Sequence, residues 1–156
     1  MSNTVMNLDR IAAERAQAII DNTIDNTKGR KAGDVENTVT KALGVLQEDG
    51  VYACFLYLLA REKVNGQAVV LEMLNLLEGL SFGWNKPKNN GNDDLSPDAV
   101  LKHIADRVTQ NLERLFLAKE TLEQMLIYAR YGAKARHVEE EKKAGEQTED
   151  KQEDNS

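Results

Sequence analysis

The sequence predicts an all-α protein, a single compact bundle of five or six helices with a central apolar helix. Apolar residues recur at intervals of three and four, and no run of strand length alternates apolar with polar residues. Residues 51–60 contain no charged or strongly polar side chain. Because an ordinary surface helix carries one apolar stripe, a helix that is apolar on all sides should be covered on all sides.

The composition fits one domain that folds without cross-links. At 156 residues the chain is long enough to bury one core. Its single cysteine, Cys54, allows no internal disulfide and fits a reducing compartment. No basic stretch followed by an apolar one opens the chain, and the apolar run 51–60 is too short to span a membrane. These features predict a cytoplasmic protein without a membrane partner.

The first predicted helix covers residues 8–26, where apolar and small residues recur at helical spacing. Asn7 is its expected N-cap. Residues 26–33 follow with two glycines and read as a basic loop, for which plain solvation is the simpler interpretation. The cations of this loop are Lys28, Arg30 and Lys31.

The second predicted helix starts with Asp34 as its cap and ends near Gly50, with apolar residues on one face. Gly44 lies inside this helix and can mark a close packing contact. The central apolar helix over 51–60 follows directly. We therefore expect a charge at Leu56 to unfold the domain.

A fourth helix is predicted over residues 67–80 from the spacing of its leucines and valines. Residues 81–94 contain glycines, a proline and several asparagines, and read as a long irregular loop. Phe82 and Trp84 are expected to fold back on the core, although an exposed tryptophan could instead anchor a partner.

Ser96 and Pro97 form the clearest helix start in the chain, a serine N-cap followed by proline at the first helical position. Helical spacing then continues to about Arg136. Because a globular domain seldom needs one helix of that length, a bend or break is expected between residues 106 and 119.

The charge is distributed unevenly along the chain. Residues 139–156 hold eight acids and three lysines, a net charge of −5, and are expected to form an acidic disordered tail. The remaining residues, 1–138, form the predicted helical domain and are close to neutral. Within that domain, residues 128–138 carry bases and no acid.

The sequence offers few groups for catalysis, and we expect no enzyme, cofactor, metal site or small-molecule substrate. Cys54 lies in the most apolar segment, where burial disfavours its thiolate. The two histidines have carboxylates at helical spacing, which leaves a metal-assisted enzyme as a minor alternative. These sets are His103 with Asp106, and His137 with Glu140 and Glu141.

Basic side chains at the ends of two predicted helices are the candidate contact residues. Arg130 and Lys134 are four residues apart and share a helix face, and Arg136 and His137 extend the row, with Tyr128 and Tyr131 interleaved. Such a row can pair with phosphates, or can simply complement the helix dipole. Arg61 and Lys63 end the central helix and allow the same two interpretations.

Three stretches resemble the small helical subunit of Cmr-type, type III-B, CRISPR effector complexes. They are LDRIAAERAQAII near the N-terminus, the glycine corner with its apolar helix in LQEDGVYACFLYLLAREK, and the closing helix LAKETLEQMLIYARYGAKAR. The resemblance implies a non-catalytic subunit for antiviral defence that stacks with copies of itself beside the other Cmr subunits. It also implies backbone contacts with CRISPR RNA or target RNA.

By position in that resemblance, Lys63 and Arg130 are expected near RNA or a neighbouring subunit. Arg61, Lys134 and Arg136 join them on the same helix ends, and the loop cations at 28–31 are weaker candidates. A helical adaptor or regulatory subunit that binds only protein is the alternative function.

Overall fold

The computed structural model describes residues 7–25, 30–62 and 64–153. Over these ranges the chain is all-α, as predicted. The described residues form six α-helices, one 3-10 helix, η2, and one two-stranded hairpin. In chain order these elements are α1 (Leu8–Thr23), α2 (Ala32–Asp49), α3 (Val51–Arg61), α4 (Val64–Gly79), β1 (Lys88–Asn89), β2 (Asn92–Asp93), α5 (Pro97–Asp106), η2 (Val108–Gln110) and α6 (Leu112–Glu153).

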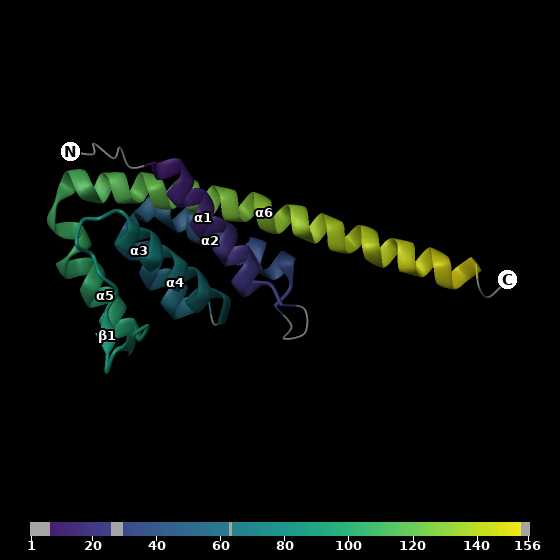
Figure 1. Ribbon diagram of the computed structural model, residues 1–156, viewed down its shortest axis with the longest axis horizontal. Coiled ribbons are helices and arrows are strands. Elements are labelled where there is room, and N and C mark those ends of the chain that lie inside the picture. The colour runs from purple at the N-terminus through teal and green to yellow at the C-terminus, as the bar shows by residue number, and fades with distance from the viewer. Residues whose placement is uncertain (1–6, 26–29, 63, 154–156) are drawn as a thin grey trace.

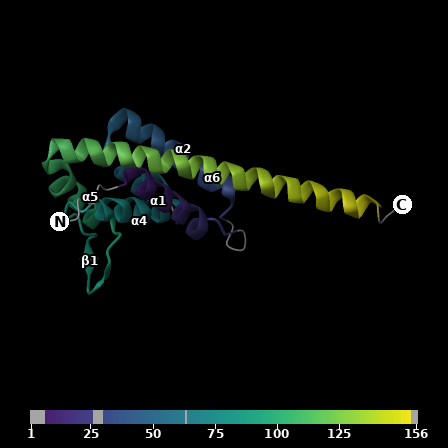
Figure 2. The same ribbon diagram turned by 45° about the horizontal axis from the view of Figure 1, so that its top comes forward.

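The long helix α6 organises the bundle. It packs on α1 and α2, while α4 packs on α1 and α3, and α5 packs on α3. Figure 1 shows α6 lying along one side of the other helices, and its yellow C-terminal part projects beyond them. The turned view in Figure 2 shows the same projection, so α6 forms both a wall of the bundle and an arm that leaves it.

The caps of the first two helices follow mostly from local sequence. Asn7 caps α1 as predicted, because its side chain accepts a hydrogen bond from the Arg10 backbone N–H at 3.0 Å. The prediction for Asp34 is wrong, since α2 begins earlier and Lys31 occupies the N-cap position. Gly50 ends α2 with φ of 99°, a conformation that favours glycine, so the tight corner into α3 is confirmed.

The expectation that α3 is covered on every side is wrong. Val51, Cys54, Phe55 and Leu58 are buried, but Tyr52 and Leu56 are 42% and 45% exposed. The reason is that α3 packs on α2, α4 and α5, and within the described part of the chain no helix packs over its remaining face. The most continuous burial belongs instead to α4, whose middle section is covered on nearly all sides.

At Gly44 and in the segment after α4, the structure differs in part from what the sequence predicts. The proposed close contact at Gly44 is wrong, because a Cβ added there would meet no atom within 4 Å. In the segment after α4, Trp84 is buried, as expected, and stacks edge-on against Phe82 with ring centroids 5.0 Å apart. That segment is not wholly irregular, because Asn90 and Gly91 adopt positive φ and close the β1–β2 hairpin.

The predicted break before the last helix is confirmed. Ser96 caps α5 through the Ala99 backbone N–H, and α5 ends at Asp106. The turn η2 follows, and the Asn111 side chain then accepts a hydrogen bond from the Arg114 backbone N–H at the start of α6. The Asn111 side-chain cap thus fixes where α6 begins after the break.

The prediction that residues 139–156 lack regular structure is wrong for the described part, because α6 continues to Glu153. No apolar face is needed for this extension. Its glutamates, lysines and glutamines are strong helix formers, and adding residues to an existing helix avoids the cost of nucleation. The acidic segment is therefore part of the same continuous helix as the basic residues that precede it.

Candidate functional site

The exposed basic site on α6 consists of Arg130, Tyr131 and Lys134, called the RYK cluster below. All three side chains are exposed, Tyr131 by 63%. The Arg130 guanidinium carbon lies 6.0 Å from the centre of the Tyr131 ring. Lys134 follows Arg130 by one helical turn on the same face. The RYK cluster thus presents two cations and an aromatic ring to solvent, which are the groups that bind phosphates and stack on bases.

Arg136 is separated from the RYK cluster, although the sequence places it in the same row. Its Nη2 lies 3.6 Å from Oδ1 of Asp21 on α1, and the side chain is only 39% exposed. A residue six positions after Arg130 lies on a different helix face, and here that face meets α1. The Arg136 charge is thus partly neutralised by Asp21, and this ion pair links α6 to α1.

Tyr128 also faces α1 instead of extending the row. Its hydroxyl donates a hydrogen bond to Asp9, and this bond together with partial burial raises the pKa of Tyr128. The ring is partly buried against the core. Tyr131 is therefore the aromatic side chain of the row that is free to stack on a ligand.

The structure does not join Arg61 to the RYK cluster through helix packing. Arg61 is exposed at the end of α3, which packs on α2, α4 and α5, whereas α6 packs on α1 and α2. Lys63 lies outside the described residues, as does Lys28. Arg30 pairs with Asp25 at 3.9 Å, and Lys31 is exposed immediately before α2.

The two histidines lie in separate surroundings. His103 on α5 is half-buried, and burial lowers its pKa, with Arg107 adding to the effect. Nε2 of His137 on α6 lies 3.2 Å from Oε1 of Glu141, so the helical spacing predicted for that pair is observed. Within the ranges described, no three His, Cys, Asp or Glu side chains are grouped so as to hold a metal ion.

Cys54 occupies the core. It is fully buried, and its Sγ donates a hydrogen bond to the Ala42 carbonyl at 3.4 Å. Burial raises the pKa of the Cys54 thiol to about 12. The fraction of thiolate at pH 8 is then about one in ten thousand.

We expect native Cys54 to resist a disulfide reagent such as DTNB at pH 8, because only the thiolate attacks it. The measurement is the absorbance of the released thiolate, compared with the same protein in denaturant, where labelling should finish at once. Labelling of the native protein at the rate of a free thiol would show that Cys54 is accessible and ionised, against the structure.

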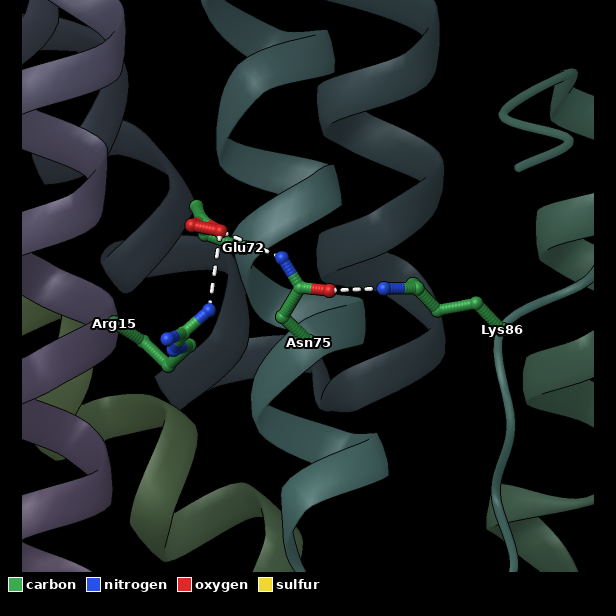
Figure 3. A network of polar contacts seen from close by, with 4 residues as sticks. All are labelled: Arg15, Glu72, Asn75 and Lys86. Atoms are coloured by element: carbon green, nitrogen blue, oxygen red, sulfur yellow. Dashed lines mark hydrogen bonds and ion pairs between the residues drawn. The ribbon is translucent and has the colours of Figure 1, made fainter. Parts of the chain in front are cut away.

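A buried polar network on α4 was not foreseen from the sequence. Glu72 is 5% exposed and lies 3.5 Å from Arg15 on α1, while the Asn75 side-chain amide donates to it at 2.6 Å. The Asn75 carbonyl oxygen accepts a hydrogen bond from Lys86 in the loop after α4, as Figure 3 shows. An acid within an apolar run, as at Glu72 between Leu71 and Met73, was the available signal. The network pairs the Glu72 carboxylate with Arg15 and joins α1, α4 and the loop after α4.

A second set of residues that the sequence did not single out lies where α3 meets α4. Glu62 there accepts hydrogen bonds from the hydroxyls of Thr38 and Tyr57 at 3.1 and 2.9 Å. Thr38 and Glu62 line a polar cavity beside α2, and Tyr57 helps to hold the Glu62 carboxylate in place. The signal would have been Thr38, a polar residue on the buried apolar face of α2, but periodicity alone does not show which helix covers it.

Across the described ranges, no helix combines the length and apolar content that a bilayer span requires. No protein-family model, curated protein or solved structure was found to match the chain.

Proposed function

We propose that this chain is the non-catalytic small subunit of a type III-B CRISPR (Cmr) effector complex and helps to hold target RNA. The proposal rests on the resemblance of three stretches and on one observation, the exposed RYK cluster of Arg130, Tyr131 and Lys134. In this role the chain stacks beside the backbone subunits and further copies of itself. Other subunits carry the chemistry of the complex.

The geometry of the RYK cluster suits the backbone of single-stranded RNA. Side chains one helical turn apart have Cβ atoms about 5–6 Å apart, close to the spacing of successive phosphates along a strand. The Tyr131 ring lies next to the Arg130 guanidinium and can stack on a base without selecting its identity. Binding of this kind is independent of sequence, as expected of a subunit whose guide RNA supplies the specificity.

The acidic continuation of α6 limits how strongly the isolated chain can bind RNA. Residues 139–141 are all glutamates and follow the RYK cluster within two turns. Their negative potential opposes phosphate binding at low salt. RNA affinity is therefore expected mainly in the assembled complex, where neighbouring subunits supply further cations.

Co-expression tests whether the chain is a Cmr subunit at all. Produced together with the other Cmr subunits and a guide RNA, the tagged chain should co-purify with them in a fixed ratio after a wash in moderate salt. Recovery of the tagged chain without those subunits would refute the assignment to a Cmr complex.

RNA contact is tested by reversing the charge of the RYK cations. In the assembled complex, Arg130→Glu with Lys134→Glu should weaken binding of single-stranded RNA. The slope of log affinity against log salt is negative, and its magnitude should decrease by about 1.4, because each lost phosphate contact removes about 0.7 for single strands. Fluorescence anisotropy over a salt series measures both quantities.

The matched control changes the same charge at exposed positions farther along α6, Lys142→Glu with Lys143→Glu. The control should leave the salt slope unchanged. An equal loss in both variants would mean a general field effect and not a contact. If the assembled complex had no affinity for single-stranded RNA even at low salt, the protein-only adaptor would be favoured.

A further inference from the structure

A polar cavity beside α2 stands apart from the RYK cluster. Its volume is about 260 Å³, and all of its lining side chains are polar. Four come from one face of α2, and two come from the corner between α3 and α4. They are Asp34, Asn37, Thr38 and Lys41 on α2, and Glu62 and Asn65 at the corner.

The corner that forms one wall is held in place by short-range packing. Gly66 is buried, and a Cβ added to it would lie 2.6 Å from both the Glu62 Cβ and the Leu58 carbonyl oxygen. The first turn of α4 therefore touches the last turn of α3. Glu62 is fixed further by the Thr38 and Tyr57 hydroxyls, one on each carboxylate oxygen. Its carboxylate is thus pre-positioned before any ligand enters.

The cavity has hydrogen-bond acceptors in excess of its donors. The Asn65 side-chain oxygen is buried and has no hydrogen-bond partner within the described ranges. A carboxylate offers about four lone-pair sites, and Glu62 uses two of them in the hydrogen bonds described. The exposed Asp34 carboxylate makes no side-chain hydrogen bond or ion pair with the described part of the chain. A buried acceptor without a donor is unfavourable, so a donor-rich ligand would gain from entering.

The net charge of the cavity indicates which kind of hydrogen-bond donor would bind in it. Asp34 and Glu62 are acidic, and Lys41 is the one basic residue in the lining, so the cavity carries a net negative charge. A phosphate would face two carboxylates. A guanidinium has five donors, no acceptor and a permanent positive charge, which matches two carboxylates and an amide oxygen.

We propose that this cavity receives an arginine side chain from a neighbouring protein subunit. The guanidinium donates to Glu62 and to the Asn65 oxygen at the inner wall, and Asp34 at the exposed rim completes the pairing. The aliphatic part of the arginine passes between α2 and the α3–α4 corner. This interface does not require RNA contact at the RYK cluster, and it serves an effector subunit and a protein-only adaptor alike.

The test titrates methylguanidinium into the full-length chain labelled with ¹⁵N, with methylammonium and inorganic phosphate as comparison probes. Methylguanidinium should produce saturable shifts at the Asn37 and Asn65 side-chain amides and at the Gly66 backbone amide. Methylammonium should bind more weakly because it has fewer donors, and phosphate should leave these resonances in place.

The variant Asp34→Asn should weaken methylguanidinium binding about tenfold, the loss expected for one charge-assisted hydrogen bond. Asp34 is exposed, so this change should leave the fold intact. Glu48→Gln removes the same charge from an exposed position at the other end of α2 and should leave binding unchanged. Equal losses in the two variants, saturable binding of phosphate, or no saturation by methylguanidinium would overturn the proposal.

In the co-purified complex, Asp34→Asn should release the chain at lower salt than Glu48→Gln does, while single-stranded RNA affinity per bound chain stays the same. Release of both variants at one salt concentration would overturn the role of the cavity in assembly. A loss of RNA affinity confined to the RYK variants would leave the cavity proposal standing, so the two proposals fail separately.

Discussion

Leu58→Asp should abolish the cooperative fold, whereas Leu56→Asp should leave the chain folded. Leu58 has no exposed surface and lies in the core, while Leu56, on the same helix α3, is 45% exposed. Removing a buried leucine side chain costs about 2–5 kcal/mol. A carboxylate placed there without a partner adds several kcal/mol more, so the sum reaches the typical stability of a domain, about 5–15 kcal/mol.

The expected cost of Leu56→Asp is far smaller. Its side chain is already 45% exposed, so less apolar burial is lost than at Leu58 and the new carboxylate can reach water. The lower helix propensity of aspartate costs about 0.5 kcal/mol. Circular dichroism at 222 nm during urea titration measures both variants. The Leu56 variant should show a single transition near that of the parent protein, and the Leu58 variant should show no folded baseline. Similar behaviour of the two variants would mean that the burial assigned to α3 is incorrect.

The contrast on α3 also explains why its burial was predicted wrongly. A helix that is apolar on all sides has no polar stripe to mark its solvent face, so periodicity carries no information about orientation. Which side is buried depends on where α2, α4 and α5 pack, and these are contacts between segments distant in sequence. Tyr52 and Leu56 consequently remain an exposed apolar pair on this helix.

Features fixed by neighbouring residues were predictable. The Asn7 cap, the Gly50 corner and the Ser96 start each depend on hydrogen bonds or backbone angles within a few residues. The break after α5 followed from an implausibly long helical pattern. The length of α6 differs from the prediction because the acidic segment needs no apolar face to be helical. Helix propensity and continuation from a packed segment are sufficient.

The candidate site likewise combines features that follow from local sequence with features that depend on how the helices pack. Arg130 and Lys134 share a face because helix geometry requires it, so their pairing could be read from their spacing. The ion pair of Arg136 with Asp21 could not, because it depends on how α6 docks on α1. The hydrogen bonds of Glu62 depend likewise on the packing of α3 against α2.

Gly66→Ala should destabilise the protein, and Gly44→Ala should stabilise it, although both glycines are helical. At Gly66 the new Cβ would lie 2.6 Å from the Leu58 carbonyl oxygen and from the Glu62 Cβ, neither of which is the end of a flexible side chain. Backbone must therefore move. Overpacking of this kind costs about 1–3 kcal/mol, more than the gain of up to about 1 kcal/mol from replacing a helical glycine.

At Gly44 the same substitution meets no atom within 4 Å, so only the propensity gain of about 0.5–1 kcal/mol remains. For a chain of this length each kcal/mol shifts Tm by about 2–4 °C. Calorimetry should thus record a higher Tm for Gly44→Ala and a lower one for Gly66→Ala. Because the clash at Gly66 also displaces Glu62, that variant should lose methylguanidinium binding at a temperature where it is still folded. A rise in Tm for both variants would show that the α3–α4 corner is looser than its geometry indicates. The Glu62 carboxylate would then not be held in place, and the cavity would not offer a fixed site for an arginine.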